Sequence, residues 1–197
     1  MSGEIRPALV MVPGRTCDGC TMCCKVFEIP EIRKADGDWC GNCEIGKGCK
    51  IYESRPQTCR DFFCQYRHDP DVPEHWKPNR SHMVVKTDNT GEKLIVGVDP
   101  SWPRAWRETP YYQDLKRWSA HRLTAGKQIM VWVGQRAIIV LPDRDIDLGI
   151  IGGRTILTIH KQTPSGVQLA FEVVARDDPR VGTAAPAPKP PLVFRQP

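Results

Sequence analysis

The crowding of cysteines toward the N-terminus is the feature that most constrains how this chain can fold. The chain has 197 residues and nine cysteines, and all nine lie within the 48 residues from Cys17 to Cys64. An odd number of cysteines without a recognisable export signal does not suit a disulfide framework. Thiol side chains gathered this closely are typical of metal ligands. We therefore predict a segment that is organised by metal binding.

The first cysteine block, residues 17–24, reads CxxCxxCC. Two intervening residues allow a turn to bring two sulfurs to about 2.3 Å from one zinc ion. The same spacing opens the cysteine run of bacterial ferredoxins, whose thiolates bind an iron–sulfur cluster. The spacing therefore predicts zinc or an iron–sulfur cluster as cofactor and leaves the choice open.

The adjacent pair Cys23 and Cys24 adds a constraint, because neighbouring side chains of an extended segment point apart. We expect these two thiols to bind different metals, or one of them to support the metal ligands without binding the metal itself. A second block of five cysteines supplies the remaining sulfurs, and His68 and His75 are possible substitute ligands. Nine thiols fill two four-ligand sites with one left over, or one site with spare thiols. We predict as metal ligands Cys17, Cys20, Cys23, Cys24, Cys40, Cys43, Cys49, Cys59 and Cys64.

Residues 49–62 carry a second pattern, C-x-I-Y-x-x-R-P-x-x-C-R-x-F. Together with CxxCxxCC, this pattern resembles the cysteine-cluster proteins described as zinc- or iron-chelating. The resemblance covers about a quarter of the chain and implies zinc or iron bound by thiolates. That family includes flagellin lysine N-methylases. The resemblance therefore also implies a second hypothesis, in which the protein is an enzyme that uses an iron–sulfur cluster for redox chemistry or protein methyl transfer. This chain is shorter than those enzymes and shows no recognisable S-adenosylmethionine pocket.

The second pattern also has a direct physical interpretation. Pro56 suits the start of a short helix that presents Cys59. Arg55 and Arg60 can donate hydrogen bonds to anionic thiolates from outside the ligand set, and we predict them as cofactor-supporting residues. The alternative is that they serve ordinary helix packing.

The cysteine-free part of the chain predicts a second kind of structure. Apolar β-branched runs separated by turn signals indicate strands at residues 81–86, 93–98, 128–133, 136–141, 155–161 and 167–175. One helix is expected to begin at Pro110, with Thr109 as its cap, and to end at Gly126. Its basic face, with Lys116, Arg117 and Arg122, is expected to be solvated. Residues 149–153 are glycine-rich, and we interpret them as a turn.

These signals predict an α+β fold with a small irregular cysteine-rich metal-binding lobe followed by a mainly antiparallel β-sheet body with one helix. The expected organisation is an N-terminal lead at residues 1–16, the cysteine-rich domain at 17–66, the body at 67–176 and a proline-rich disordered tail at 177–197.

The formal charge of +5 counts cysteines as neutral thiols. A zinc ion with four thiolates carries about −2, so metal binding would remove most of the basic excess. Nucleic acid is therefore not the expected partner, whereas a metal ion or cluster is, and a protein partner stays open. No apolar run approaches the roughly 20 residues that span a membrane, and residues 1–16 lack the apolar core of a secretory signal. We expect a cytoplasmic protein.

Three functions follow from the sequence. The leading one is a metal-binding protein whose thiolate site organises its fold. The second is a redox or methyl-transferring enzyme, which needs an open coordination position or a substrate pocket beside the cysteines. The third is an adaptor for nucleic acid or protein that is stabilised by structural zinc. The body shows no phosphate-binding loop, serine-nucleophile motif or zinc-protease motif, so catalytic residues stay unassigned.

Overall fold

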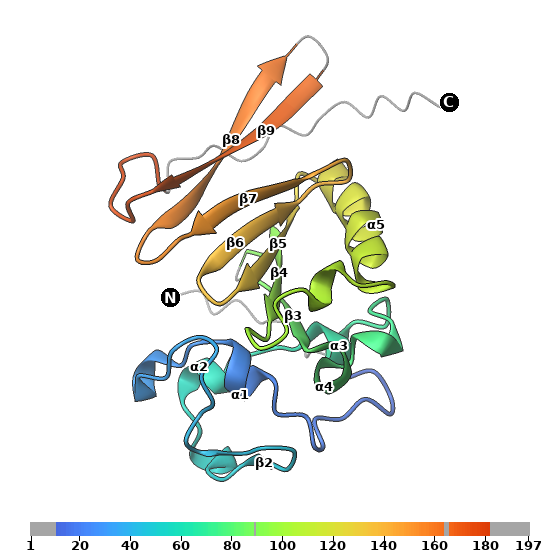
Figure 1. Cartoon of the computed structure of the whole chain (residues 1–197), viewed down its shortest axis with the longest axis vertical. Coiled ribbons are helices and arrows are strands. Elements are labelled where there is room, and N and C mark those ends of the chain that lie inside the picture. Colours follow the sequence, from blue (N-terminus) through green and yellow to red (C-terminus); the bar gives the residue numbers. More distant parts are fainter. Residues whose placement is uncertain (1–10, 89, 164–165, 182–197) are drawn as a thin grey trace, which may run out of the picture.

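The computed structural model describes residues 11–88, 90–163 and 166–181. Its centre is a five-stranded sheet with the strand order β3-β4-β5-β6-β7 (Figure 1). The strands β4 and β5 are parallel, and the other neighbours are antiparallel. The sheet consists of β3 (Met83–Thr87), β4 (Lys93–Val98), β5 (Gln128–Val133), β6 (Arg136–Val140) and β7 (Asp145–Ile150).

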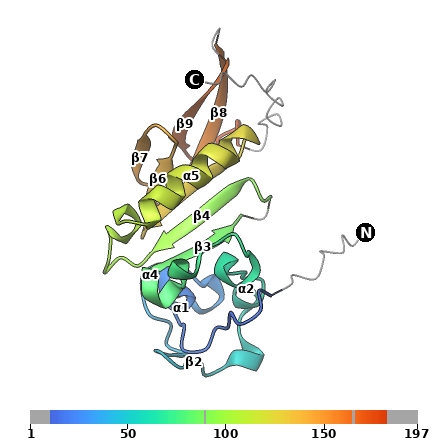
Figure 2. The same cartoon turned by 90° about the vertical axis from the view of Figure 1, so that its right-hand side faces the viewer.

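One face of the sheet is covered by the helix α5 (Tyr111–Thr124), which lies in the connection between β4 and β5 together with η4 (Ala105–Arg107) (Figure 2). Parallel neighbours need such a crossover connection, because a tight turn cannot join them. Leu115 of α5 is fully buried against alternate residues of the strands, among them Val96 and Val131. This face holds the main hydrophobic core.

The opposite face is covered at its two ends by different structures. The cysteine-rich lobe, residues 17–64, packs Met22 and Val26 against Val84 of β3. The hairpin of β8 (Thr155–Thr163) and β9 (Gly166–Val174) packs against Met130 and Ile139 of the sheet. The part of this face between the lobe and the hairpin is left uncovered by both.

The lobe and the short segment that follows it are built from small elements. The helix α1 begins at the adjacent cysteines, and β1 pairs with β2 as a minimal antiparallel ladder. The elements are α1 (Cys23–Val26), η1 (Pro30–Ile32), β1 (Cys43–Glu44), β2 (Gly48–Cys49), η2 (Tyr52–Ser54), α2 (Gln57–Arg60), α3 (Gln65–His68), η3 (Glu74–Trp76) and α4 (Pro78–Ser81).

Gly97 of β4 allows the lobe to lie directly on the sheet. A Cβ atom at this position would stand 2.5 Å from Cγ1 of Val26 and 2.7 Å from Cε1 of Phe27. An ion pair reinforces the same junction, because Nζ of Lys25 lies 2.7 Å from Oδ1 of Asp99, and the two side chains are only 12% and 6% exposed. The lobe is therefore held to the body by close packing and by a nearly buried charge pair.

The predicted α+β class is confirmed. The helix and the six strands predicted in the body are present, with bounds that differ by a few residues. The helix begins after Pro110, and its cap makes no side-chain hydrogen bond, so the expected Thr109 cap is wrong. Residues 164–165 of the last predicted turn and residues 182–197 of the predicted tail lie outside the described residues.

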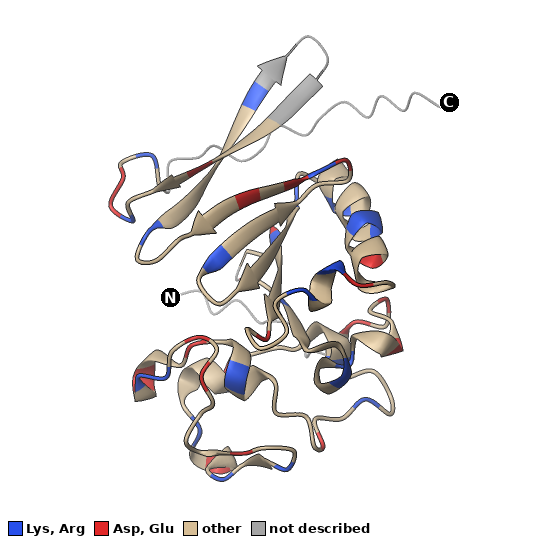
Figure 3. Cartoon of the chain, in the orientation of Figure 1, with Lys and Arg blue, Asp and Glu red and all other residues tan. Residues whose placement is uncertain are grey.

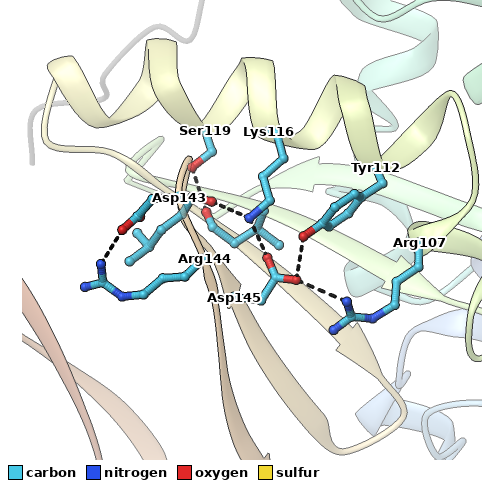
Figure 4. Close-up of polar contacts among 9 residues, drawn as sticks. Arg107, Tyr112, Lys116, Ser119, Asp143, Arg144 and Asp145 are labelled. Carbon is cyan, nitrogen blue, oxygen red and sulfur yellow. Dashed lines mark hydrogen bonds and ion pairs between the residues drawn. The ribbon is translucent and has the colours of Figure 1, made fainter.

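The strand β7 was not predicted, and the assignment of residues 149–153 as a turn is wrong for Gly149 and Ile150, which end this strand. Two acidic side chains conceal the strand in the sequence. The carboxylate of Asp145 accepts hydrogen bonds from Nζ of Lys116 at 2.8 Å and from the hydroxyl of Tyr112 at 2.9 Å (Figure 4). Asp147 pairs with Arg136 of β6. Acidic residues can thus occupy a strand whose neighbours supply cations.

The expectation that the basic face of α5 is solvated holds for Arg117, whose side chain is 66% exposed, and is wrong for Lys116 and Arg122. The side chain of Lys116 is only 20% exposed, and its Nζ also donates to the carbonyl of Leu141 at 2.6 Å (Figure 4). Arg122 donates to the carbonyl of Gly91 at 3.3 Å. Over the described part of the ribbon, Lys and Arg are interspersed with Asp and Glu (Figure 3).

Candidate metal centre

All nine cysteines are free thiols, and they lie in the lobe at different depths. Cys40 is buried, Cys17 is exposed, and the other seven are partly buried. Their mutual contacts divide them into two groups, which differ in position and surroundings.

The larger set, called here the six-cysteine group, gathers around the β1-β2 ladder. Cys43 and Cys49 stand directly opposite each other across this ladder, so their side chains share one face. The thiol of Cys24 is hydrogen-bonded to the thiols of both Cys23 and Cys43. The group is completed by Cys40, which lies near Cys43, and by Cys59, which lies near Cys24, Cys40 and Cys49.

Short backbone hydrogen bonds bring the two blocks of this group together. The amide of Cys40 donates to the carbonyl of Cys24 at 3.0 Å, and the amide of Cys43 donates to the carbonyl of Cys40 at 2.9 Å. The second bond closes the CxxC turn that the sequence predicted. Pro56 precedes α2, which carries Cys59, as expected.

The adjacent cysteines do not behave as the sequence suggested. Cys23 and Cys24 are the first two residues of α1 and are not part of an extended segment. The extended conformation assumed for the pair is therefore wrong, and the thiol of Cys23 is close enough to raise the pKa of Cys24. Whether the two thiols serve different metals stays a prediction. A turn of helix changes the directions on which that expectation depended.

The second set, called here the three-cysteine group, consists of Cys17, Cys20 and Cys64. A turn closed by the amide of Cys20 and the carbonyl of Cys17, at 2.8 Å, joins the first two. Cys17 and Cys20 both lie close enough to Cys64 for their thiolate charges to raise its pKa. Cys20 and Cys64 also pack with Val26 in the junction between lobe and sheet.

Backbone amides contact two of the three sulfurs of this second group. The sulfur of Cys20 accepts hydrogen bonds from the amides of Met22 and Asn79, and that of Cys64 accepts from the amides of Tyr66 and Arg67. Amides directed at sulfur stabilise thiolates and tune metal centres that contain them. Asn79 belongs to α4, outside the predicted lobe, and the sequence offered no signal for it.

Five of the thiols resist ionisation without a cation, namely those of Cys20, Cys24, Cys43, Cys59 and Cys64. Burial raises the pKa of Cys64 to about 12, and burial together with the neighbouring Cys24 charge raises the pKa of Cys43 to about 11. The hydrogen bond with Cys23, followed by burial, raises the pKa of Cys24 well above its ordinary value. A bound metal cation would reverse this balance, since its charge favours the thiolates.

Lys34 is a cation beside the six-cysteine group that sequence reasoning missed. It is buried, and its Nζ donates to the carbonyl of Lys25 at 2.6 Å. Burial lowers the pKa of Lys34, while nearby Asp36 and Cys40 oppose that change. Its charge in turn favours the thiolate of Cys24. A single lysine in a polar loop gives no sequence signal for this position.

The predicted supporting residues Arg55 and Arg60 contact backbone carbonyls. Arg55 donates to the carbonyl of Tyr52 at 2.8 Å and lies over its ring, and Arg60 donates to the carbonyls of Glu53 and Arg55, both at 2.9 Å. These bonds brace the segment that leads into α2 and Cys59. Their support of a cofactor stays a prediction.

The two candidate histidines lie in different surroundings. Nε2 of His75 is 2.6 Å from a carboxylate oxygen of Asp114, which also accepts from the indole of Trp76 at 2.8 Å. His68 is the last residue of α3, whose N-cap is Cys64, and its Nδ1 is buried with no hydrogen-bond partner among the described residues. This nitrogen keeps His68 a candidate ligand.

Within the described part of the chain, no group of three or more His, Cys, Asp or Glu side chains is arranged to hold a metal ion as it stands. The donor chemistry nevertheless fits a thiophilic metal, since each group consists of thiols with a common neighbourhood.

Comparison with protein-family models, curated proteins and solved structures gave no match to this chain. The resemblance to the CxxCxxCC family therefore stays a prediction. In the same described residues, no helix is both long and apolar enough to cross a membrane.

Proposed function

We propose that this protein binds zinc or an iron–sulfur cluster through cysteine thiolates of the lobe between Cys17 and Cys64, and that the bound metal organises the lobe. The observation that carries the proposal is the six-cysteine group, in which thiols from three separate stretches of the lobe share one neighbourhood. In a protein with free thiols, such convergence is more typical of metal binding than of packing.

The residues that would hold the metal are those of the two cysteine groups, with His68 as a further candidate. Bound zinc would supply structural cross-linking and an iron–sulfur cluster could also supply electron transfer. Lys34 would offset part of the negative charge of the thiolates. The amides of Met22, Asn79, Tyr66 and Arg67 would stabilise the sulfurs of the three-cysteine group.

Anaerobic purification followed by metal analysis and a visible absorption spectrum tests the proposal. Zinc in a colourless protein, or iron and sulfide in a brown one, is expected at about one or more equivalents per chain. Absence of both metals at that level from protein purified without oxygen or chelator would refute the proposal.

Two single substitutions address the number of centres. Cys43→Ser alters the six-cysteine group, and Cys64→Ser alters the three-cysteine group. If each group binds its own metal, each variant loses part of the metal and retains the rest. If both variants lose all of it, one shared site is indicated. Ser54→Ala, in an exposed turn of the same lobe, is the control and should keep the full metal content.

A further inference from the structure

A groove lies between the lobe and the sheet, on the face that α5 does not cover. Its main cavity has a volume of about 1150 Å³ and is lined from the lobe by Phe27, Phe62 and Phe63 and from the sheet by Ile95 and Trp132. Ile95 and Trp132 point to this side because their strand neighbours Val96 and Val131 point to the core under α5. The floor of the groove is thus an apolar strip of sheet.

The groove continues toward the β8-β9 hairpin. A second cavity of about 500 Å³ shares Asp88, Ile95 and Trp132 with the first and reaches Ile156 of β8. The two cavities therefore form one channel across β4 and β5, with the lobe at one end and the hairpin at the other.

The two ends of the groove carry opposite charges. At the lobe end, the exposed carboxylates of Glu28, Asp36 and Asp61 outnumber the one ammonium, Lys86, whose Nζ lies 4.3 Å from the centre of the Phe27 ring. At the hairpin end, the groove is lined by three basic side chains, those of Lys93, Arg154 and Arg176, and by the carboxylate of Asp88, which also lines the first cavity. An apolar floor separates the acidic end from the basic end.

The volume and the charges together restrict the occupant. Pockets for small ligands usually measure about 300–1,000 Å³, and the main cavity alone exceeds this range. A nucleic acid would meet three carboxylates at the lobe end, and these carboxylates would repel its phosphates. A polypeptide segment can place apolar side chains on the floor and carry different charges at its two ends.

We propose that the groove binds an extended segment of a partner protein whose middle is apolar, with a basic end over Glu28, Asp36 and Asp61 and an acidic end over Lys93, Arg154 and Arg176. The apolar residues would contact Ile95 and Trp132, and the charged ends would fix the direction of the segment. This proposal needs the folded lobe as one wall of the groove, so it rests on the proposed metal binding only in so far as metal folds the lobe.

Selection from a phage-displayed library of random peptides of about ten residues, which span about 33 Å when extended, tests the proposal on the full-length protein as purified. The expected result is enrichment of peptides with apolar central residues, basic residues at one end and acidic residues at the other. Enrichment of peptides without this charge pattern, or no enrichment, would overturn the proposal.

Groove variants show whether the enriched peptides bind at this site. Trp132→Ala removes the central ring of the floor and should weaken peptide affinity by about tenfold or more, as measured by fluorescence anisotropy. The matched control is Trp102→Ala, which alters an exposed tryptophan that stacks on His82 and does not line the groove. Equal affinity of the two variants would place the peptide elsewhere and overturn the proposal.

Charge reversal at exposed positions keeps the test independent of folding. Arg176→Glu should weaken binding of the dipolar peptide by about two- to fivefold and strengthen binding of a peptide with basic residues at both ends. Arg104→Glu, at an exposed position outside the groove, should change neither. Self-association of the wild type that Trp132→Ala abolishes would instead identify a second copy of the chain as occupant and overturn the proposal.

Discussion

The body and the lobe reach their structures by different means. The body has a helix of 14 residues and sheet strands of five or six residues around fully buried side chains such as Leu115, Ile129 and Val131. The lobe has α-helices of four residues and strands of two residues. Only six of its 48 residues are buried, namely Thr21, Met22, Val26, Ile29, Lys34 and Cys40.

This difference separates two sources of stability. Burial of apolar surface orders the body, because its strands place alternate residues in the core under α5 and against the lobe or the hairpin. The lobe buries few apolar side chains, so we expect this burial alone not to offset the conformational entropy of ordering its loops. The difference makes the thiols the natural source of the missing stabilisation, in line with the proposed metal binding.

Removal of metal gives the largest expected effect and tests whether the lobe, unlike the body, depends on metal for its stability. Structural zinc supplies roughly 10–16 kcal/mol in small metal-organised folds, so a strong chelator should unfold the lobe. In hydrogen exchange, amides of residues 17–64 should lose protection while those of β5 and β6 keep theirs. A lobe that stays protected without metal would show that its few buried residues are sufficient.

The substitution Asp99→Asn should have the next largest effect, because it leaves the ammonium of Lys25 nearly buried without a charge partner. Breaking such a pair costs about 3–5 kcal/mol when it is fully buried, and we expect about 3 kcal/mol here, measured by urea denaturation at pH 7. The control Asp143→Asn removes an exposed charge that pairs with Arg144 and should cost less than about 1 kcal/mol.

Acid should erase the effect of Asp99→Asn. Burial would raise the pKa of Asp99, but hydrogen bonds from Lys25 and from the amide of Ser101 lower it below its ordinary value. A lowered folded-state pKa stabilises the protein above the unfolded value of about 3.9, and this contribution is lost as the pH falls through the folded-state value. The stability difference between wild type and variant should therefore shrink below about pH 4. A difference that stays constant would mean that the charge of Asp99 is not its cause.

The substitution Gly97→Ala should have a smaller effect than metal removal or Asp99→Asn, and it tests how tightly the lobe packs on β4. The added methyl group would collide with Val26 and Phe27, and overpacking of this kind costs about 1–3 kcal/mol. Gly153→Ala is the matched control, because a Cβ atom there meets no heavy atom within 4 Å. Thermal unfolding of both variants checks the expectation. Equal melting temperatures would show that the lobe can shift away from β4 at little cost.

The same two sources of stability explain what could be predicted from the sequence. The strands Lys93–Val98 and Gln128–Val133 and the helix after Pro110 were found because their apolar residues repeat with a period that matches burial. The strand β7 was missed because Asp145 and Asp147 break that pattern and are paired by cations from elsewhere in the chain. Such pairing is a property of the fold and leaves no local signal.

At the candidate site, the spacing of the cysteines predicted the turns but did not determine which cysteines lie together in the fold. The pattern of CxxC elements led to the turns at Cys17 to Cys20 and Cys40 to Cys43. It could not show that Cys64 joins the first block, because that contact depends on how α3 packs against the sheet. Lys34 was missed for the same reason, since only tertiary structure buries its charge beside Cys24.

The hydrogen bond from the amide of Asn79 to the sulfur of Cys20 has a practical consequence for dissecting the protein into fragments. A fragment that ends at Tyr66, where composition changes, would contain every cysteine and still lack this donor. It would also lack Glu74, whose carboxylate accepts the hydroxyl of Tyr66 at 2.7 Å, and Asp99, the partner of Lys25. The cysteines lie within one stretch of 48 residues, but a piece that keeps these partners must extend past β4, at least to Asp99.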